Sequence, residues 1–262
     1  MKTKFASVFC TLIACTSLVH AAEQKVYTVA TDATFPPFEY TTANGGVAGY
    51  DIDLMHALCD QAEIKCNVIA AAWSGMFPGL LGKKYDALIS SLNVTEERKR
   101  VMAFSDVYER PVYQFVAARD KHVDINPAGL KGKTIGVEIG TPMDAFVTQK
   151  FGDVATVKRY DSGSEPYLDL ASGRIDALFS YRAQIQSSFL DKDGNATHYV
   201  LVGPGYTGAD SPVLGEGVAI ALRKQDDVLR SKLNQALAAL RANGSLKKIN
   251  DKWFGANSTV TQ

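Results

Sequence analysis

The sequence predicts an α/β fold built as two lobes, and three observations support this prediction. About 241 residues follow an apolar N-terminal segment, which is long for one hydrophobic core and comfortable for two. Short β-branched strands alternate with amphipathic helices, a pattern typical of mostly parallel sheets. A motif around Asp86 reappears around Asp176, 90 residues later, so the repeated unit is the size of a whole lobe.

The N-terminal segment is predicted to be a secretory signal peptide covering residues 1–21. Lys2 and Lys4 precede an apolar stretch from Phe5 to Val19, and Val19-His20-Ala21 has the form of a signal peptidase site. The alternative is a lipoprotein signal, because Leu12-Ile13-Ala14-Cys15 resembles a lipobox that would be lipidated at Cys15. No later apolar run approaches the ~18 residues of a membrane helix. We therefore expect a soluble periplasmic protein, with lipid anchoring as the lesser alternative.

Charge and cysteine content narrow the class of protein. Basic and acidic residues number 28 each, and the signal removes two lysines, so the mature chain is slightly acidic and unlike a nucleic-acid-binding protein. Outside the signal only Cys59 and Cys66 remain, and two cysteines in an exported protein indicate one disulfide. The alternative is a pair of free buried thiols. Metal binding is less favoured, because no His or Cys cluster accompanies them.

The first half predicts two strand–helix units. A strand over residues 27–31 runs into Asp32-Ala33-Thr34-Phe35-Pro36, and an amphipathic helix over 52–61 leads to a strand over 67–72. Ser74 is expected to cap the next short helix. The side chains of that helix expected to face inward are Met76, Phe77, Leu80 and Leu81.

The second half repeats this plan. A strand over residues 134–137 runs into Glu138-Ile139-Gly140-Thr141-Pro142, and Arg174 to Ser180 matches Lys84 to Ser90. Near the end, Asp226 or Asp227 starts a helix that Gly244 stops, and Ser245 opens a last helix. The apolar positions of these two helices are Leu229, Leu233, Leu237 and Leu240 in the first, and Leu246, Ile249 and Trp253 in the second.

Several of these motifs together resemble the polar amino-acid-binding proteins of ABC importers, the solute-binding protein family 3. The relatives in view bind lysine, arginine and ornithine, or histidine, or opines. The resemblance covers the whole mature chain in order. The motifs that carry it are Asp32 to Phe38, Gly49 to Leu54, Asp86 to Ser91, Thr95 to Arg98, Phe104-Ser105, Gly140-Thr141 and Leu170 to Ala177.

The resemblance implies a type II periplasmic-binding-protein fold, with lobe two inserted in lobe one. Lobe one is then expected over 22–109 and 205–262, and lobe two over 110–204. Two hinge strands would join them near residues 110–113 and 202–211, and hinge closure around the ligand is expected, as for periplasmic binding proteins generally. The implied function is that of the ligand-binding component of an ABC transporter, a monomer without cofactor or metal whose partner is a membrane permease.

In lobe one, the matching Arg of the family grips the ligand's α-carboxylate, and here this is Arg98. Its planar guanidinium suits two parallel hydrogen bonds to a carboxylate. The alternative is a surface arginine paired with a neighbouring Glu, since Arg98-Lys99-Arg100 is a charged run. Ser90, Ser91 and Asn93 match positions that hold the ligand's ammonium, with Asn93 standing where close relatives have Ser.

Three further residues of lobe one match positions around the ligand's side chain. Phe35 and Trp73 stand where relatives place aromatic rings, which stack well on flat cations. The alternative for both is core packing, which we favour for Phe77, Phe104 and Phe115. Asp32 ends the first strand and matches the Asp that meets the side-chain nitrogen, or it simply forms the turn before Ala33-Thr34.

In lobe two, Thr141 stands at a predicted helix N-terminus that suits the same carboxylate, or it only caps its own helix. Pro142 departs from the family, because proline has no N–H to offer. Tyr181 replaces the acidic residue that neutralises the ligand's ammonium in relatives, and Arg182 follows it. Glu138, with Asp32, puts negative charge at the side-chain end.

The ligand expected from these residues has a carboxylate at one end and a cationic or amide nitrogen at the other. Basic amino acids lead, and an arginine-derived opine or related guanidino compound is the alternative because Tyr181 leaves an α-ammonium without a counter-ion. A periplasmic enzyme such as a cyclohexadienyl dehydratase is a further alternative, with Glu138 as the candidate acid. The last alternative is that the chain is the ligand-binding module of a receptor.

Overall fold

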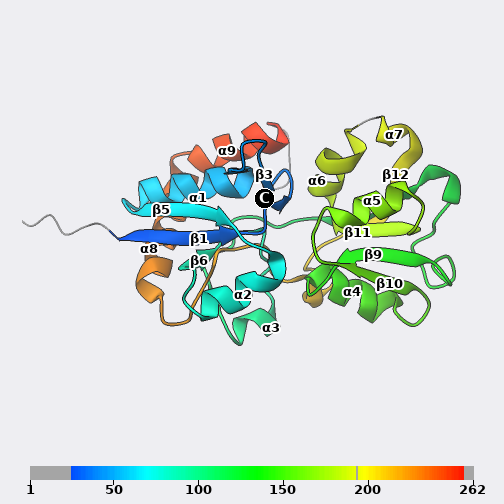
Figure 1. The fold of residues 1–262 in the computed structure, drawn as a ribbon, viewed down its shortest axis with the longest axis horizontal. Coiled ribbons are helices and arrows are strands. Elements are labelled where there is room, and N and C mark those ends of the chain that lie inside the picture. The colour runs from blue at the N-terminus through cyan, green and yellow to red at the C-terminus, as the bar shows by residue number, and fades with distance from the viewer. Residues whose placement is uncertain (1–24, 193, 257–262) are drawn as a thin grey trace, which may run out of the picture.

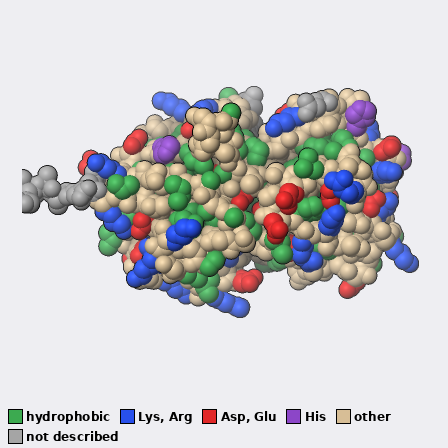
Figure 2. Space-filling model, in the orientation of Figure 1, with side chains coloured by type: hydrophobic (Ala, Val, Ile, Leu, Met, Phe, Trp, Pro, Cys, Tyr) green, Lys and Arg blue, Asp and Glu red, His purple; other side chains and the backbone are tan. Residues whose placement is uncertain are grey.

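The computed structural model describes residues 25–192 and 194–256, which form two α/β lobes side by side (Figure 1). The predicted signal peptide and the lipidation alternative at Cys15 lie outside the described residues. Within these ranges, every helix is too short or too polar to span a lipid bilayer. Basic and acidic side chains are interspersed over the face drawn in Figure 2.

The first lobe has a five-stranded sheet in the order β5-β1-β6-β13-β7. Its strands are β1 (Val26–Thr31), β5 (Lys65–Ala70), β6 (Ala87–Leu88), β7 (Ala103–Phe104) and β13 (Ala221–Leu222). Successive residues of β1 face opposite layers, as strand geometry requires. Val29 packs with α1 (Tyr50–Gln61), α8 (Asp227–Ala242) and α9 (Ser245–Phe254), whereas Ala30 packs with α2 (Trp73–Leu81). α3 (Glu96–Lys99) and a small sheet of β2 (Thr34–Phe35), β3 (Glu39–Thr41) and β4 (Val47–Ala48) complete the lobe.

The second lobe has a sheet in the order β10-β9-β11-β8-β12. Phe115 and Phe179 face α4 (Pro142–Phe151), whereas Val116 and Leu178 face α5 (Glu165–Ala171) and the helical turns after β11. The strands are β8 (Tyr113–Ala118), β9 (Thr134–Glu138), β10 (Thr156–Tyr160), β11 (Ala177–Tyr181) and β12 (Tyr199–Tyr206). The remaining helices are α6 (Arg182–Ile185), a π-helical turn (Gln186–Leu190), α7 (Asn195–His198) and 3₁₀ turns at Arg119–Lys121 and Pro212–Leu214.

Each sheet is mostly parallel, as predicted, because four of its five strands point the same way and one is reversed. In each sheet the three strands of the strand–helix units run parallel, and the other two pairings are antiparallel. The reversed strands are β13 in lobe one and β8 in lobe two, and each of them follows a crossing between the lobes. A chain that leaves a lobe and returns must run back along the same sheet edge, which the strand–helix pattern does not reveal.

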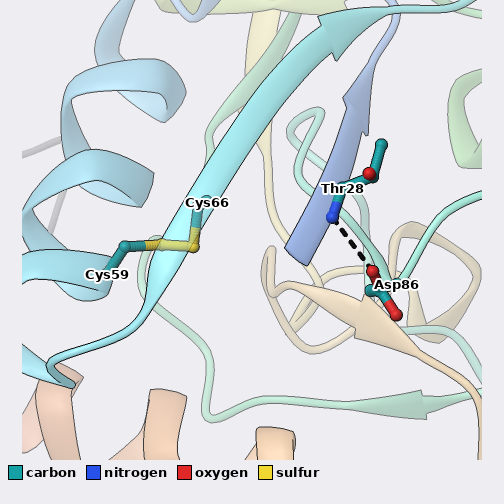
Figure 3. The surroundings of a disulfide bond; sticks show 4 residues. All are labelled: Thr28, Cys59, Cys66 and Asp86. Atoms are coloured by element: carbon teal, nitrogen blue, oxygen red, sulfur yellow. Dashed lines mark hydrogen bonds between the residues drawn. A yellow bond between two sulfur atoms is a disulfide. The ribbon is translucent and has the colours of Figure 1, made fainter. Parts of the chain in front are cut away.

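The internal repeat is confirmed as a repeated contact. The Asp86 carboxylate accepts a hydrogen bond from the backbone N–H of Thr28 at 2.9 Å, and Asp176 accepts one from the N–H of Thr134 at 2.8 Å (Figure 3 draws the first). The N–H of each aspartate in turn donates to the carbonyl of the same threonine. The motif therefore joins β1 to the start of β6 in lobe one, and β9 to the start of β11 in lobe two.

Four predictions about the first lobe need correction. The strand predicted over 67–72 is β5 at Lys65–Ala70, because its register pairs Val26 with Lys65 and ends where β1 ends. Ser74 is not a cap: α2 begins at Trp73, and Ala72, still extended, is its N-cap. Leu81 is 47% exposed instead of facing inward. The helix predicted over 52–61 begins two residues earlier, at Tyr50.

Other predictions of local structure are confirmed. Cys59 at the end of α1 and Cys66 in β5 form a disulfide with their Cα atoms 6.2 Å apart (Figure 3), so the free-thiol alternative is wrong. α8 and α9 follow Asp226 and Ser245 as expected. Gly244 separates them with a φ of +77°, a left-handed conformation that glycine adopts without strain.

The chain crosses between the two sheets twice, after β7 and after β12. The first crossing ends beside the point where the second begins, because Tyr113 at the start of β8 pairs with Tyr206 at the end of β12. The exact lobe boundaries at residues 109/110 and 204/205 stay a prediction.

Candidate ligand-binding site between the lobes

Side chains of both lobes meet around a small polar cavity at the carboxyl ends of β1, β6, β9 and β11. Ligands of open α/β sheets bind at this edge. The cavity has a volume of about 20 Å³, room for about one water molecule, so the lobes are closed on each other. All ten predicted site residues line it, and their ligand-binding roles stay predictions. The lining is Asp32, Phe35, Glu39, Trp73, Ser90, Ser91, Asn93, Arg98, Glu138, Thr141, Pro142, Met143 and Tyr181.

A larger pocket of about 630 Å³ lies beside the crossings, lined by rings and prolines such as Phe38, Pro111 and Phe254. Arg182 faces this pocket, where its Nε donates to Gln114 Oε1 at 2.8 Å, and it does not line the polar cavity. We assign the site to the polar cavity, because charged side chains from both lobes converge there, as small polar ligands require.

Arg98 is buried at the cavity, so the surface alternative is wrong. Thr95 caps α3 by accepting from the Arg98 N–H, and this places the side chain against the second lobe. The guanidinium donates to the carbonyls of Asn93 at 3.2 Å and Gly140 at 3.4 Å. Within residues 25–192 and 194–256, no carboxylate forms an ion pair with it, and burial lowers its pKa. A buried guanidinium without a counter-charge is suited to binding an anion.

Aromatic rings support Arg98 and link the lobes. Its guanidinium carbon lies 5.6 Å from the Trp73 ring centroid and 5.0 Å from that of Phe77. Trp73 Nε1 donates to the carbonyl of Ile139 in the second lobe at 3.0 Å. Phe35 meets Tyr181 edge to face, with 5.1 Å between centroids. The rings of Phe35, Trp73 and Tyr181 thus form walls of the cavity, whereas Phe115 is in the core of lobe two, as predicted.

Two carboxyl groups from opposite lobes, Asp32 and Glu138, face the cavity. Asp32 accepts from the Thr34 hydroxyl, and burial raises its pKa despite that bond. Burial, and then the negative charge of Asp32, raise the pKa of Glu138 well above its ordinary range. Glu138 Oε1 is buried with no hydrogen-bond partner among the described residues. This end of the cavity therefore lacks a donor or cation, which a ligand can provide.

A second carboxyl pair, Glu39 and Asp51, lies behind Ser90 and Ser91. The Ser90 hydroxyl donates to Glu39 at 3.0 Å, and the Ser91 N–H donates to Asp51 at 2.6 Å. Glu39 and Asp51 also share a hydrogen bond. Burial raises the pKa of Asp51 to about 6, and burial and the charge of Asp51 raise that of Glu39 well above its ordinary range. The pair holds the two serines in position at the cavity.

Tyr181 reaches from β11 across to the first lobe. It is 1% exposed, and its hydroxyl contacts the Ser91 carbonyl oxygen at 2.9 Å and Asn93 Oδ1 at 2.8 Å. Asn93 Nδ2 donates to the Tyr113 hydroxyl and to the Leu214 carbonyl. Burial raises the pKa of Tyr181 well above its ordinary value, so the phenol stays neutral.

Thr141 caps α4, since its hydroxyl oxygen accepts from the Asp144 N–H at 3.2 Å, and it also lines the cavity. Two lining residues were missed from the sequence, Glu39 and Met143. Glu39 lies within a short Phe-Glu-Tyr stretch, where an acidic residue between aromatic ones was the only signal. Among the described residues, no group of three His, Cys, Asp or Glu side chains is placed to hold a metal ion.

Comparison with known proteins places the chain in a family. Residues 27–256 match the model of the bacterial extracellular solute-binding proteins, family 3. The L-arginine-binding protein of Pseudomonas aeruginosa is 37% identical over 239 residues, with 91% of each chain covered. The histidine-binding periplasmic protein of Salmonella typhimurium is 34% identical over 240 residues, again with 91% of each covered.

Solved structures agree with the sequence relatives. The structure of an ancestral arginine-binding protein bound to arginine superposes with a TM-score of 0.80 at 33% identity, covering 88% of this chain and 98% of that one. Residues 27–256, which match the family model, include both lobes and both crossings. On this evidence the chain belongs to family 3 of the bacterial extracellular solute-binding proteins and has their two-lobed type II fold.

Proposed function

We propose that this chain is the periplasmic ligand-binding component of an ABC importer and delivers its ligand to a membrane permease as a monomer. Its ligand is a small molecule with a carboxylate at one end and a cationic or amide nitrogen at the other, the class that includes arginine, lysine, ornithine and histidine. Relatives named for arginine and histidine support this class. The lobes close on the ligand by bending at the two crossings, and the chain releases it chemically unchanged.

The buried guanidinium of Arg98 is the observation that carries the proposal. It lies between the lobes on aromatic rings, without a carboxylate partner among the described residues. A ligand carboxylate would supply the missing charge and accept two parallel hydrogen bonds. The opposite charge, at Asp32 and Glu138, selects for a cationic far end, and Phe35 and Trp73 provide faces for a flat guanidinium or imidazole.

Replacing Arg98 tests this proposal. Thermal unfolding in the presence of basic amino acids, guanidino acids and opines would first identify ligands, since a ligand bound only to the folded state raises stability. In calorimetric titrations, Arg98→Ala is then expected to lose about 2–5 kcal/mol, or about 30-fold to several thousand-fold in affinity.

Arg100→Ala is the matched control, because Arg100 is exposed two residues further on. It should bind as the unmodified protein does. An Arg98→Ala variant with unchanged affinity would remove Arg98 from the site, and no binding across the panel would refute the ligand class.

The alternative of an opine or guanidino compound keeps one supporting observation, the neutral Tyr181 beside Arg98. Arg182, which follows Tyr181 in the sequence, faces the larger pocket instead of the polar cavity. The cavity therefore favours a guanidino compound with a single carboxylate over an opine.

A further inference from the structure

We propose that Tyr181 makes the site selective for ligands that lack an ammonium group beside their carboxylate: ω-guanidino and ω-amino carboxylic acids bind more tightly than the α-amino acids of the same length. This inference rests on the proposed function, in particular on a carboxylate bound by Arg98, and it narrows the ligand class within it.

The first step is that the acceptors near Arg98 already have donors. Ser91 O and Asn93 Oδ1 both lie within hydrogen-bond distance of the Tyr181 hydroxyl, at 2.9 and 2.8 Å, so its single hydrogen is directed at this pair. The Asn93 carbonyl oxygen, next along, accepts from Arg98 itself. An ammonium attached to the carbon next to the bound carboxylate would lie among these groups. It carries three donors and would have to compete with the Tyr181 hydroxyl and the Arg98 guanidinium for these oxygens.

The second step is charge. A cation beside the carboxylate would lie close to the Arg98 guanidinium, and the hydroxyl that faces it belongs to a phenol that stays neutral. The carboxyl groups behind this part of the cavity, Glu39 and Asp51, are engaged with the two serines and with each other. A buried charge without partners is costly, so an ammonium at this position weakens binding.

The third step concerns Glu138, whose buried carboxyl oxygen lacks a hydrogen-bond donor among the described residues. Glu138 Oε1 has no partner among the described residues, and the charge that acts on Glu138 most strongly is that of Asp32. A single cation between these two carboxyl groups would relieve their repulsion and lower both pKa values. The cavity thus calls for one cationic group, placed against Glu138 and Asp32.

Matched ligand pairs test the inference, since the members of each pair differ only in the α-amino group. The pairs are arginine with 5-guanidinopentanoate, lysine with 6-aminohexanoate, and ornithine with 5-aminopentanoate. In calorimetric titrations the acid without the α-amino group is expected to bind about 10-fold more tightly or better, the factor for one uncompensated polar contact.

Two variants connect this preference to Tyr181. Tyr181→Phe frees both acceptors and should reduce the ratio of affinities within a pair toward one, and Tyr181→Asp, which adds a counter-charge, should invert it. Tyr160→Phe, at a hydroxyl bound to Asp169 in lobe two, is the control and should leave the ratio unchanged. Thermal unfolding establishes that each variant is folded.

The outcomes separate the inference from the proposed function. If arginine binds as tightly as 5-guanidinopentanoate or more tightly, or if Tyr181→Phe leaves the ratio unchanged in the folded protein, the inference is wrong and the proposed function stands. If no member of any pair binds, the proposed function itself is wrong.

Discussion

The residues with the most unusual environment are the buried pair Glu39 and Asp51 behind the cavity. The ordinary pKa of an Asp is 3.8, and burial raises that of Asp51 to about 6. Between pH 4 and 6 the folded protein therefore holds a proton that the unfolded chain has released. Stability from this group is present at low pH and lost as the pH rises through that window.

Asp51→Asn should remove this loss, because an amide does not ionise. A shift of about two pH units corresponds to ~3 kcal/mol, so the free energy of unfolding of the variant, relative to the unmodified protein, should rise by up to this amount between pH 4 and 6. Urea unfolding across this range measures the difference. Asp60→Asn, exposed on the same helix, is the control. A difference between Asp51→Asn and the unmodified protein that does not vary with pH would contradict the prediction.

At the residue scale, a side chain of the cavity could be predicted from the sequence where it belongs to a recognisable motif. Arg98 was identified through Thr95-Glu96-Glu97-Arg98. The cap that Thr95 forms on α3 follows from local hydrogen bonding. Glu39 was missed because its role depends on Asp51 and Ser90, brought to it by the fold. The hydroxyl contacts of Tyr181 could not be foreseen for the same reason, since Ser91 and Asn93 are in the other lobe.

At the scale of elements, the disulfide joins α1 to β5 at the end of the sheet remote from the cavity. Cys66 pairs with Tyr27 near the start of β1, whereas the cavity begins beyond the other end of that strand. Closing so short a loop contributes about 2.5 kcal/mol in the chain-entropy model. The bond is therefore expected to stabilise lobe one without shaping the site.

Replacing both cysteines by alanine should lower the free energy of unfolding by about this amount and leave ligand affinity unchanged. Urea unfolding and calorimetry test the two parts. Reductant should destabilise the unmodified protein and have no effect on the double variant. Thiol counting that finds two reactive thiols in denatured protein from the periplasm would contradict the bond itself.

Elements with strong periodicity or clear end signals were predicted to within two residues. α8 and α9 have leucines at helical spacing and a glycine between them. The start of α2 was misjudged because Ser74 is a good capping residue in isolation, while the chain leaving β5 becomes helical one residue earlier. The register of β5 depends on its pairing with β1, which no local pattern encodes.

At the scale of the whole molecule, hinge closure can be followed through Trp73, which bonds to Ile139 across the cleft. The chain has two tryptophans, so Trp253→Phe leaves Trp73 as the reporter. If the lobes separate without ligand, the indole loses this bond and enters water. Ligand is then expected to shift its fluorescence to shorter wavelength, with the affinity found by calorimetry.

The control is Trp73→Phe, which keeps Trp253, a residue bonded to Asp53 within lobe one. Its emission should not respond to ligand. Binding by calorimetry with constant Trp73 emission would show that the lobes do not move apart.

The two-lobed plan itself was predictable, because the repeat around Asp86 and Asp176 reports a contact that each lobe makes within itself. The reversal of β13 and β8 was not, since it depends on where the chain passes from one sheet to the other.

The two crossings between the lobes also have an evolutionary consequence. Because Tyr113 and Tyr206 are paired neighbours, the segment between them enters and leaves lobe two at one place. Such a segment is a cassette that recombination can exchange between relatives through two adjacent junctions. Arg98 would stay with the host while Glu138 and Tyr181 arrive with the insert. If the site binds ligand as proposed, a new ligand preference can be acquired in one genetic step that leaves Arg98 in place.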